Sequence, residues 1–337
     1  MSSRSSRCTQ SARRLAVLKC HLVSSSAPPD AAKLHHEALR QGVATAMETG
    51  CPLLLARIEA GVCVIVLNAP SRRNALGDDL TPFLRDLIKR VATDGRVRAV
   101  LLTGAGGSFC AGGNVKAMAG SNADAPGASV QVPVASRTDW TGLAAGASDQ
   151  QGLDGQIVRQ ATLTGALHAL PQPTLAALPG AAAGAGFSIA LACDLRVAAA
   201  SAFITTAFRR VALPGDYGAS WLLPRLVGPA KAKQLFFTAE RVPAPECLKL
   251  GIVQEVTADA AVHARALDLA KDIANGPQHA MRAYKRNIND AMDGISFREG
   301  LTNEAMRMTE IFSNTEALQQ FHEATRAFVE KREPSFH

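Results

Sequence analysis

Two turns built from small residues are the segments of this chain best suited to chemistry. One spans residues 109–114 and reads FCAGGN, and the other spans residues 180–186 and reads GAAAGAG. Each follows an apolar run typical of a strand, and we expect the second turn, and also the first, to open a helix. Small side chains let a ligand lie against main-chain N–H groups. Two such turns can form an anion hole, which suits a thioester carbonyl that is becoming an enolate.

Other glycine-rich sites fit these turns poorly. A phosphate-binding P-loop needs Gly-Lys followed by Ser or Thr, and neither turn contains lysine. A dinucleotide fingerprint needs a third glycine, but Ile189 and Phe109 occupy the corresponding positions. The chain also contains no Gly-x-Ser-x-Gly, the motif of many serine hydrolases. For either turn alone, tight strand-to-helix packing remains an alternative.

The charge of the chain is concentrated at its N-terminus. The 337 residues are 47% hydrophobic and carry a net charge of +7, enough apolar content for one large core or two modest ones. Five basic residues precede the first acid, Asp30, and +7 less these five leaves +2 for the remainder. We therefore expect no DNA-binding face. The five residues are Arg4, Arg7, Arg13, Arg14 and Lys19.

The first 29 residues are rich in Ser and Arg and free of acid, the composition of an organellar transit peptide. A disordered extension and a start codon placed too early are the alternatives. We expect a cytoplasmic protein, or a mitochondrial one if this segment is a transit peptide. The longest run of small apolar residues, 181–193, is too short to cross a bilayer, so we expect no membrane association.

The cysteines point to a reducing compartment. Their number, seven, is odd, their spacing is irregular and no Cys-x-x-Cys occurs, which argues against disulfides and structural zinc. Cys110 and Cys193 lie beside the two turns and could be nucleophiles, although a buried, small hydrophobic role is commoner. The eight histidines show no metal-ligand spacing, so we expect no metal site.

The expected elements form an α/β core followed by a helical segment. Residues 1–50 are expected to be a disordered or weakly ordered extension, residues 51–257 the core and residues 258–337 the helical segment. Apolar stripes on that segment, which include Ala305, Met308, Ile311 and Phe312, favour packing against other subunits. Residues 119–152 are expected to form a long mobile loop. Strands are expected at 53–60, 62–68, 98–103, 174–178 and 195–198, and helices at 78–92, 156–170, 184–192, 217–226, 231–238, 260–274, 277–292, 297–312 and 315–331.

Several short pieces, taken together and in order, resemble one family. They are residues 67–70 (LNAP) with 73–76 (RNAL), 109–114 (FCAGGN), 184–186 (GAG) followed by 192–195 (ACDL), 223–228 (LPRLVG), 251–253 (GIV), and 326–328 (RAF) with 331–334 (KREP). On these residues the chain resembles the crotonase, or enoyl-CoA hydratase/isomerase, family over roughly residues 53–333. The resemblance implies a crotonase-like (ClpP/crotonase) spiral core of repeated strand-strand-helix turns. It also implies a helical tail that assembles a homotrimer or a dimer of trimers.

The resemblance also assigns the binding residues. The oxyanion hole would be the main-chain N–H groups of Gly113 and Ala185, although the family usually has Gly in place of Ala185. Coenzyme A would enter as part of an acyl-CoA substrate, with no separate cofactor. Basic residues would line the mouth of its site: Arg72, Arg73, Lys116 and Lys331. The remaining substrate-binding positions would be Ala75, Ala111, Asn114 (where the family usually has Asp), Ser188 and Phe208.

The chain departs from the hydratases of this family at two positions. Those enzymes activate water with two glutamates, which fall at about Ser188 and Ala207 here. Asp216 is the carboxylate that remains, in a segment that looks like the branch with a single aspartate, which moves a double bond or opens a strained ring. Apolar neighbours such as Trp221 and Leu222 would raise the pKa of Asp216 and favour a proton shuttle. The alternative role for Asp216 is to N-cap a helix that begins at Tyr217.

Three functions follow from these observations. The leading one is an acyl-CoA isomerase that stabilises an enolate through Gly113 and Ala185 and moves a proton through Asp216. The second is conventional hydration of a 2-enoyl-CoA, as in fatty-acid β-oxidation. The third is a catalytically silent relative that binds acyl-CoA or RNA. The acyl group itself is not expected to be readable from the sequence.

Overall fold

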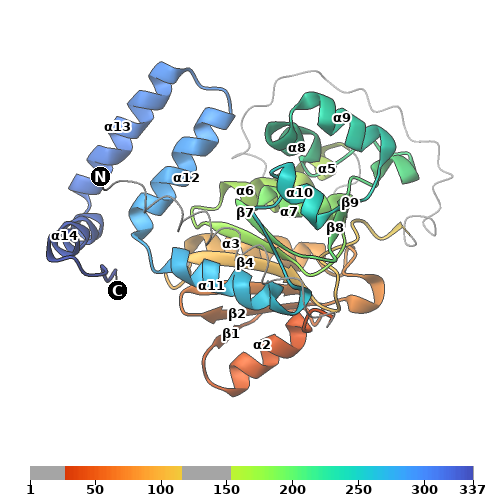
Figure 1. Ribbon diagram of the computed structural model, residues 1–337, viewed down its shortest axis with the longest axis horizontal. Helices are drawn as coiled ribbons and strands as arrows, with labels where there is room; N and C mark the ends of the chain where they lie inside the picture. The colour runs from red at the N-terminus through yellow and green to blue at the C-terminus, as the bar shows by residue number, and fades with distance from the viewer. Residues whose placement is uncertain (1–26, 116–152, 337) are drawn as a thin grey trace, which may run out of the picture.

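The computed structural model describes residues 27–115 and 153–336 (Figure 1). Its main sheet has seven strands in the order β1-β2-β3-β4-β5-β7-β10, antiparallel from β1 to β3 and parallel from β3 onward. These strands are β1 Thr45–Met47, β2 Leu54–Glu59, β3 Val62–Leu67, β4 Ala99–Gly104, β5 Thr174–Leu178, β7 Leu195–Ala199 and β10 Glu255–Thr257. A second sheet contains β6 Ala182–Ala183, β8 Phe203–Thr205 and β9 Val242–Pro243.

Helices cover both faces of the main sheet, with α11 on one side and α3 and α6 on the other (Figure 1). The strands β3, β4 and β5 are buried along their whole length, as parallel strands covered on both faces must be. The helices are α2 Ala31–Arg40, α3 Thr81–Thr93, α5 Leu153–Gln160, α6 Ala166–Ala169, α7 Ala185–Ala192, α8 Ala219–Val227, α9 Pro229–Thr238, α10 Ala244–Lys249, α11 Val262–Ala274, α12 Gln278–Met292, α13 Phe297–Ser313 and α14 Thr315–Glu330.

The expected strands and helices between residues 53 and 331 are confirmed where they fall within the described residues, with ends shifted by a few residues. The expected helix at 156–170 is divided into α5, a π-helical turn at Ala161–Gly165 and α6. The loop expected at 119–152 lies outside the described residues. The helix expected after the first turn cannot be followed beyond Val115 for the same reason. The short strands β6, β8, β9 and β10 and the helix α10 were not expected, because elements of two to six residues carry too little periodicity.

Ordered structure begins earlier than expected. The expectation that residues 1–50 are disordered or weakly ordered is wrong for residues 31–47, which form α2 and β1. The side chain of Asp30 caps α2, and Ala31, His35 and Ala38 on that helix are buried. The strand β1 pairs with β2. This segment is held by tertiary packing, and its two histidines and small apolar residues give only a weak sequence pattern.

The helical segment also begins at a different point. Helix α11 packs on β3, β4, β5 and β7 and therefore belongs to the core, so the boundary expected after residue 257 is one helix too early. Helices α12, α13 and α14 contact one another and form an arm beside the core (Figure 1). A salt bridge of 2.8 Å between Lys285 Nζ and Asp194 Oδ2 ties α12 to the core. None of the described helices is long and apolar enough to cross a membrane.

Candidate functional site

The two small-residue turns lie against each other and are joined by main-chain hydrogen bonds. The first turn follows β4 and the second follows β5. The carbonyl of Ala181 accepts hydrogen bonds from the N–H groups of Phe109 (3.0 Å) and Cys110 (3.2 Å). In return, the N–H of Ala183 donates to the carbonyl of Cys110 (2.9 Å). The turns therefore form one corner, and as expected the second turn opens a helix, α7, at Ala185.

Glycine is required where the two backbones approach most closely. A Cβ atom on Gly186 would lie 2.4 Å from the carbonyl oxygen of Cys110, closer than real Cβ atoms come. A Cβ atom on Gly112 would lie 2.7 Å from the carbonyl oxygen of Ala183 and 3.3 Å from the nitrogen of Ala185. Gly112 also has a φ of +90°, a conformation that favours glycine. Both glycines let the first turn reach the start of α7.

The two expected oxyanion donors, Gly113 and Ala185, lie on these adjoining backbones. Leu76 forms a parallel bridge with Gly113: its N–H donates to the carbonyl of Gly112 (2.7 Å), and its carbonyl accepts from Asn114 (2.9 Å). The N–H of Gly113 therefore points away from Leu76, and within the described residues it donates to no main-chain carbonyl. Ala185 is the first residue of α7, so its N–H has no acceptor within the helix. The helix dipole adds partial positive charge at that end.

Asn74, which was not among the residues predicted from the sequence, holds the first turn in place. Its side chain is fully buried and its backbone adopts a left-handed φ of +56°. Its Oδ1 accepts a hydrogen bond from the N–H of Ala69 (2.9 Å), while its Nδ2 donates to the carbonyls of Ala105 (2.9 Å) and Ser108 (2.8 Å). Asparagine tolerates a left-handed backbone, so its place in the RNAL piece was the available signal.

Asp216 lies on a loop that contacts α7 one turn beyond Ala185. The hydroxyl of Ser188 is within hydrogen-bond distance of the main-chain carbonyls of Asp216 (3.0 Å) and Gly184 (3.3 Å). The side-chain Oδ1 of Asp216 is buried and has no hydrogen-bond partner within the described residues. Burial raises the pKa of this carboxyl to about 6. A carboxylate with no partner and a pKa near neutrality is suited to taking up and returning a proton.

Asp216 does not cap a helix, so the alternative role weighed for it is wrong. Helix α8 begins at Ala219, its N-cap residue is Gly218, and no side chain makes a capping hydrogen bond. Asp216 contacts α8 through its main-chain carbonyl, which accepts a hydrogen bond from the N–H of Ala219 (3.3 Å). The residues that follow Asp216 border a largely apolar hollow of about 650 Å³, whose wall includes Tyr217 and Trp221.

The two positions at which the family resemblance places the glutamates of the hydratases, Ser188 and Ala207, carry no carboxylate. Ser188 is fully buried, and its hydroxyl faces the main-chain carbonyls described above. Ala207 has a left-handed φ of +58° and precedes a short helix that begins at Phe208. Phe208 is buried and stacks on Phe236, with ring centroids 6.2 Å apart. Within the described residues, no group of three or more His, Cys, Asp and Glu side chains could hold a metal ion.

The basic residues expected at the mouth of the site are in different situations. The guanidinium of Arg72 donates to both oxygens of Asp79, at 2.6 and 2.7 Å, so its charge is already paired. Arg73 is exposed, and its carbonyl accepts from the N–H of Ala111 (3.0 Å), which places it directly beside the first turn. Ala75 is buried within the same segment. Lys116 lies outside the described residues.

Within one chain, Lys331 is not close to the corner. It is the exposed C-cap residue of α14, on the helical arm. The carbonyl of Phe336, near the end of the chain, accepts a hydrogen bond from Arg98. Arg98 precedes β4, whereas the first turn follows β4, so these two points lie at opposite ends of that strand.

The two cysteines beside the turns are buried. The thiol of Cys110 donates to the carbonyl of Asn74 (3.0 Å), and the thiol of Cys193 donates to the carbonyl of Ile189 (3.6 Å). Burial raises the pKa of each thiol to about 12, so neither forms the thiolate that a nucleophile requires near neutral pH. Both cysteines therefore act as small hydrophobic residues of the core.

Comparisons with known proteins agree with this geometry. A family model described as enoyl-CoA hydratase/isomerase matches residues 57–141 and 135–337. The 1,2-epoxyphenylacetyl-CoA isomerase of Escherichia coli (strain K12) is 30% identical over 284 residues, which cover 84% of this chain and 97% of that protein. The mitochondrial enoyl-CoA hydratase domain-containing protein 2 of Homo sapiens is 33% identical over 291 residues, covering 84% of this chain and 87% of that protein.

Solved structures give the same result. An enoyl-CoA hydratase from Polaromonas sp. JS666 superposes with a TM-score of 0.69 at 28% identity, covering 84% of this chain and 98% of that chain. An enoyl-CoA hydratase from Bacillus anthracis superposes with a TM-score of 0.67 at 26% identity, covering 87% and 98%. The crotonase-like α/β fold with a C-terminal helical segment, expected from the motifs, is confirmed by this likeness.

Proposed function

This chain belongs to the enoyl-CoA hydratase/isomerase family, and on that premise we propose that it is an isomerase that moves a double bond or opens a ring in an acyl-CoA. It is an enzyme of that family and acts on an acyl-CoA thioester. The finer proposal depends on one observation: Asp216 carries an unpartnered and partly desolvated carboxylate, and its main chain contacts α7 one turn from the corner.

The proposed reaction uses main-chain donors and one base. The thioester oxygen accepts hydrogen bonds from the N–H groups of Gly113 and Ala185. The carboxylate of Asp216 removes a proton from one carbon of the acyl group, the C–H electron pair moves into the acyl system, and negative charge develops on the held oxygen. Asp216 then returns the proton to a different carbon, which restores the carbonyl and completes the shift. Each oxyanion donor of this kind is worth about 3 to 4 kcal/mol of transition-state stabilisation.

Hydration needs an additional group that activates water. Ser188 and Ala207 stand where hydratases of the family carry glutamates, and neither has a carboxylate. Asp216 would have to position the water and move the proton alone. These substitutions favour isomerisation over hydration, and the carboxylate at Asp216 favours an active enzyme over a silent acyl-CoA-binding protein.

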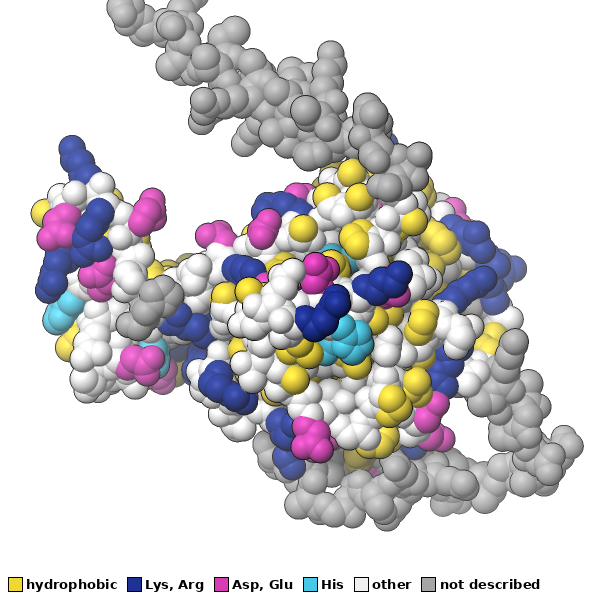
Figure 2. All heavy atoms as spheres, turned by 90° about the horizontal axis from the view of Figure 1, so that it is seen from below, with side chains coloured by type: hydrophobic (Ala, Val, Ile, Leu, Met, Phe, Trp, Pro, Cys, Tyr) yellow, Lys and Arg dark blue, Asp and Glu magenta, His cyan; other side chains and the backbone are white. Residues whose placement is uncertain are grey.

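The face shown in Figure 2 does not favour RNA binding. On the face shown in Figure 2, Lys and Arg side chains are interspersed with Asp and Glu and with apolar patches, without a continuous basic surface. Nucleic-acid binding usually needs a concentrated basic face. Arg73, exposed beside the first turn, suits the phosphates of coenzyme A better.

We propose that the arm formed by α12, α13 and α14 assembles the chain into a homotrimer or a dimer of trimers. Large apolar side chains on this arm remain exposed in the single chain, among them Phe297 at 83% and Phe328 at 85%. Apolar area of this extent is normally covered by a protein partner. Light scattering coupled to size-exclusion chromatography would give the mass of the assembly, and a monomer would contradict this proposal.

Deuterium incorporation tests the proposed reaction. The enzyme is incubated in deuterated water with a panel of 2-enoyl-CoA and 3-enoyl-CoA esters, and the products are analysed by mass spectrometry and NMR. Isomerisation predicts products that have gained no water. Deuterium at the carbon that receives the proton would show that the proton on Asp216 exchanges with solvent before its return, and an unlabelled isomer would show that the same proton is returned directly. A gain of one water would identify a hydratase instead, and absence of turnover with every ester would favour the silent binding protein.

A further inference from the structure

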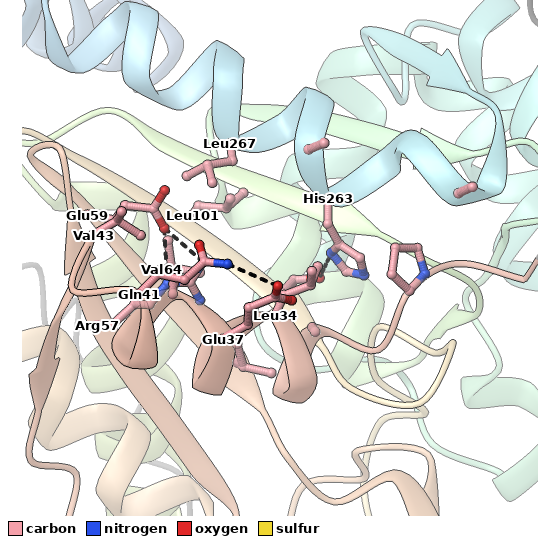
Figure 3. A pocket seen from close by; sticks show the side chains of 17 residues that line it. Leu34, Glu37, Gln41, Val43, Arg57, Glu59, Val64, Leu101, His263 and Leu267 are labelled. Carbon is pink, nitrogen blue, oxygen red and sulfur yellow. Dashed lines mark hydrogen bonds and ion pairs between the residues drawn. The ribbon is translucent and has the colours of Figure 1, made fainter.

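A second pocket of about 270 Å³, mostly apolar but with charged and polar side chains at its ends, lies between α2, α11 and the main sheet (Figure 3). None of its lining residues belongs to the two turns or to the loop that carries Asp216. Its floor is one face of three strands, because Arg57, Val64 and Leu101 lie directly opposite one another in register. Glu59, Val66 and Thr103 lie two residues away along the same strands and share that face.

One end of the pocket carries buried charge. Arg57 is 5% exposed and Glu59 is 8% exposed. The Nε and Nη2 atoms of Arg57 both donate to Oε2 of Glu59, at 3.2 and 3.1 Å, while Nζ of Lys271 donates to Oε1 at 2.6 Å. Two cations thus share one buried carboxylate, and Nη1 of Arg57 has no partner among the described residues. The only other carboxylate in the lining is the exposed Glu37, which accepts from the amide of Gln41 (3.1 Å).

The opposite end carries a buried histidine. His263 is 6% exposed, and its Nε2 is buried without a hydrogen-bond partner within the described residues. Its Nδ1 lies 3.4 Å from the hydroxyl of Thr103, which itself donates to the carbonyl of Ala177 (3.0 Å). Burial lowers the pKa of His263 to about 4, although Asp30 and the nearby Pro29 carbonyl oppose that shift, so the ring is neutral at pH 7. The Pro29 carbonyl does not form a hydrogen bond of normal geometry with Nε2. A hydroxyl group can satisfy Nε2 in either tautomer, since it both donates and accepts.

The middle of the pocket is apolar, and small residues keep it open. Val64, Val66 and Leu101 form the floor, and Ala38 from α2 and Ala264 from α11 contribute only methyl groups. Strand spacing places the Cα atoms of Arg57 and Thr103 about 12 Å apart, a span that two side chains and a small rigid molecule can fill. The ends therefore differ in chemistry, with a guanidinium at one and an imidazole at the other.

We propose that this pocket binds a small hydroxycarboxylic acid with an apolar body, its carboxylate on Arg57 and its hydroxyl on His263. The carboxylate supplies the second negative charge that Arg57 and Lys271 lack. The hydroxyl partners Nε2 of His263, and the hydrocarbon lies on Val64 and Leu101. Such a site is separate from the acyl-CoA site and would respond to free acids.

Three probes test the two ends of the pocket separately. The first is para-hydroxybenzoate. Benzoate lacks its hydroxyl group, and methyl para-hydroxybenzoate lacks its negative charge. Isothermal titration calorimetry on the full chain is expected to show saturable binding of para-hydroxybenzoate. Benzoate should bind about tenfold more weakly, because one hydrogen bond is lost. The ester should bind at least as weakly as benzoate, because its charge-assisted contact is lost.

A blocking variant shows where the probe binds. Ala264 is exposed at the rim, so Ala264→Leu should fold normally, fill the pocket and abolish binding of para-hydroxybenzoate. The matched control is Ala230→Leu, on the exposed side of α9, which should bind as the wild type does. Equal affinities for the three probes, unchanged binding by Ala264→Leu, or no saturable binding would each overturn the proposal. Isomerase activity should be the same in wild type and Ala264→Leu, so the two proposals can fail independently.

Discussion

The corner formed by the two turns and the loop that carries Asp216 lie one helical turn apart, yet they are held in different ways. The corner is fixed by main-chain hydrogen bonds between the turns and by the buried side chain of Asn74. The Asp216 loop is held through its main chain, by Ser188 and by the start of α8, while its carboxylate oxygen Oδ1 has no partner. Donors to a developing oxyanion gain from being fixed beforehand. A proton shuttle needs a side chain that no other contact neutralises.

The largest expected effect comes from removing the base. Asp216→Asn keeps the shape of the side chain but cannot take up a proton, so kcat should fall about 100- to 10,000-fold. Affinity for the acyl-CoA, measured by calorimetry, should change little. The matched control is Asp293→Asn, a carboxylate on the neighbouring apolar hollow, which should keep wild-type kcat. Full activity in Asp216→Asn would remove this residue from the mechanism.

The next largest effect should come from pushing the two turns apart. In Gly112→Ala the new Cβ meets the carbonyl of Ala183 and the nitrogen of Ala185, so kcat/KM should fall about 100- to 1000-fold. Gly107→Ala, just before the first turn, is the control, because Gly107 also has a positive φ (+72°) but has no atom within 4 Å of its Cβ position. Equal losses in both variants would mean that backbone strain, and not the approach to Ala185, determines activity.

Asn74 should matter for stability more than a typical surface asparagine does. Asn74→Ala leaves three main-chain groups without their partner, two of them in buried hydrogen bonds, which should lower the free energy of unfolding by about 3 kcal/mol. Asn68→Ala, which removes one exposed hydrogen bond to the Pro52 carbonyl, should cost under about 1 kcal/mol. Urea denaturation measures both values. Equal costs would show that the first turn does not depend on Asn74.

The pH dependence gives the smallest effect. The pKa of Asp216 is raised to about 6 by burial, so its basic form is lost as pH falls through 6, and kcat/KM at pH 5 should be about tenfold below its plateau. The folded carboxyl holds its proton more tightly than the unfolded one, so this group lowers stability as pH rises from about 4 to 6.

Asp216→Asn should therefore unfold at a higher temperature than the wild type above pH 6, and the difference should vanish below about pH 4. Thermal unfolding across this pH range measures it. A wild-type activity profile that is flat between pH 5 and pH 8 would show that no group with this pKa controls the reaction.

The sequence predicted the close approach of the two turns better than it predicted the contacts of the side chains around them. Glycine and alanine at fixed positions after two apolar strands implied close backbone contact, and the structure shows that contact at Gly112 and Gly186. The role of Asn74 was not predicted, because two of its three main-chain partners lie 31 and 34 residues away in sequence. The pairing of Arg72 with Asp79 was not predicted, because the sequence does not show that the chain turns between them and brings their side chains together.

The N-terminal helix and strand were also not predicted, because they depend on contacts with distant parts of the chain. Helix α2 and strand β1 exist because β2 offers a pairing edge and the sheet offers a face to cover, and neither is visible from residues 31–47 alone. Likewise, α11 looked like the other C-terminal helices in its periodicity, but it packs on the sheet whereas they form the arm. Periodicity predicts that a helix forms. It does not say which surface the helix covers.

The most direct test of the account is a crystal structure of the enzyme with a bound, unreactive acyl-CoA analogue. The thioester oxygen should lie about 3 Å from the main-chain nitrogens of both Gly113 and Ala185, with the carboxylate of Asp216 facing the carbon that loses its proton. A thioester oxygen that faces solvent, or a carboxylate of Asp216 that points away from the acyl group, would contradict the account.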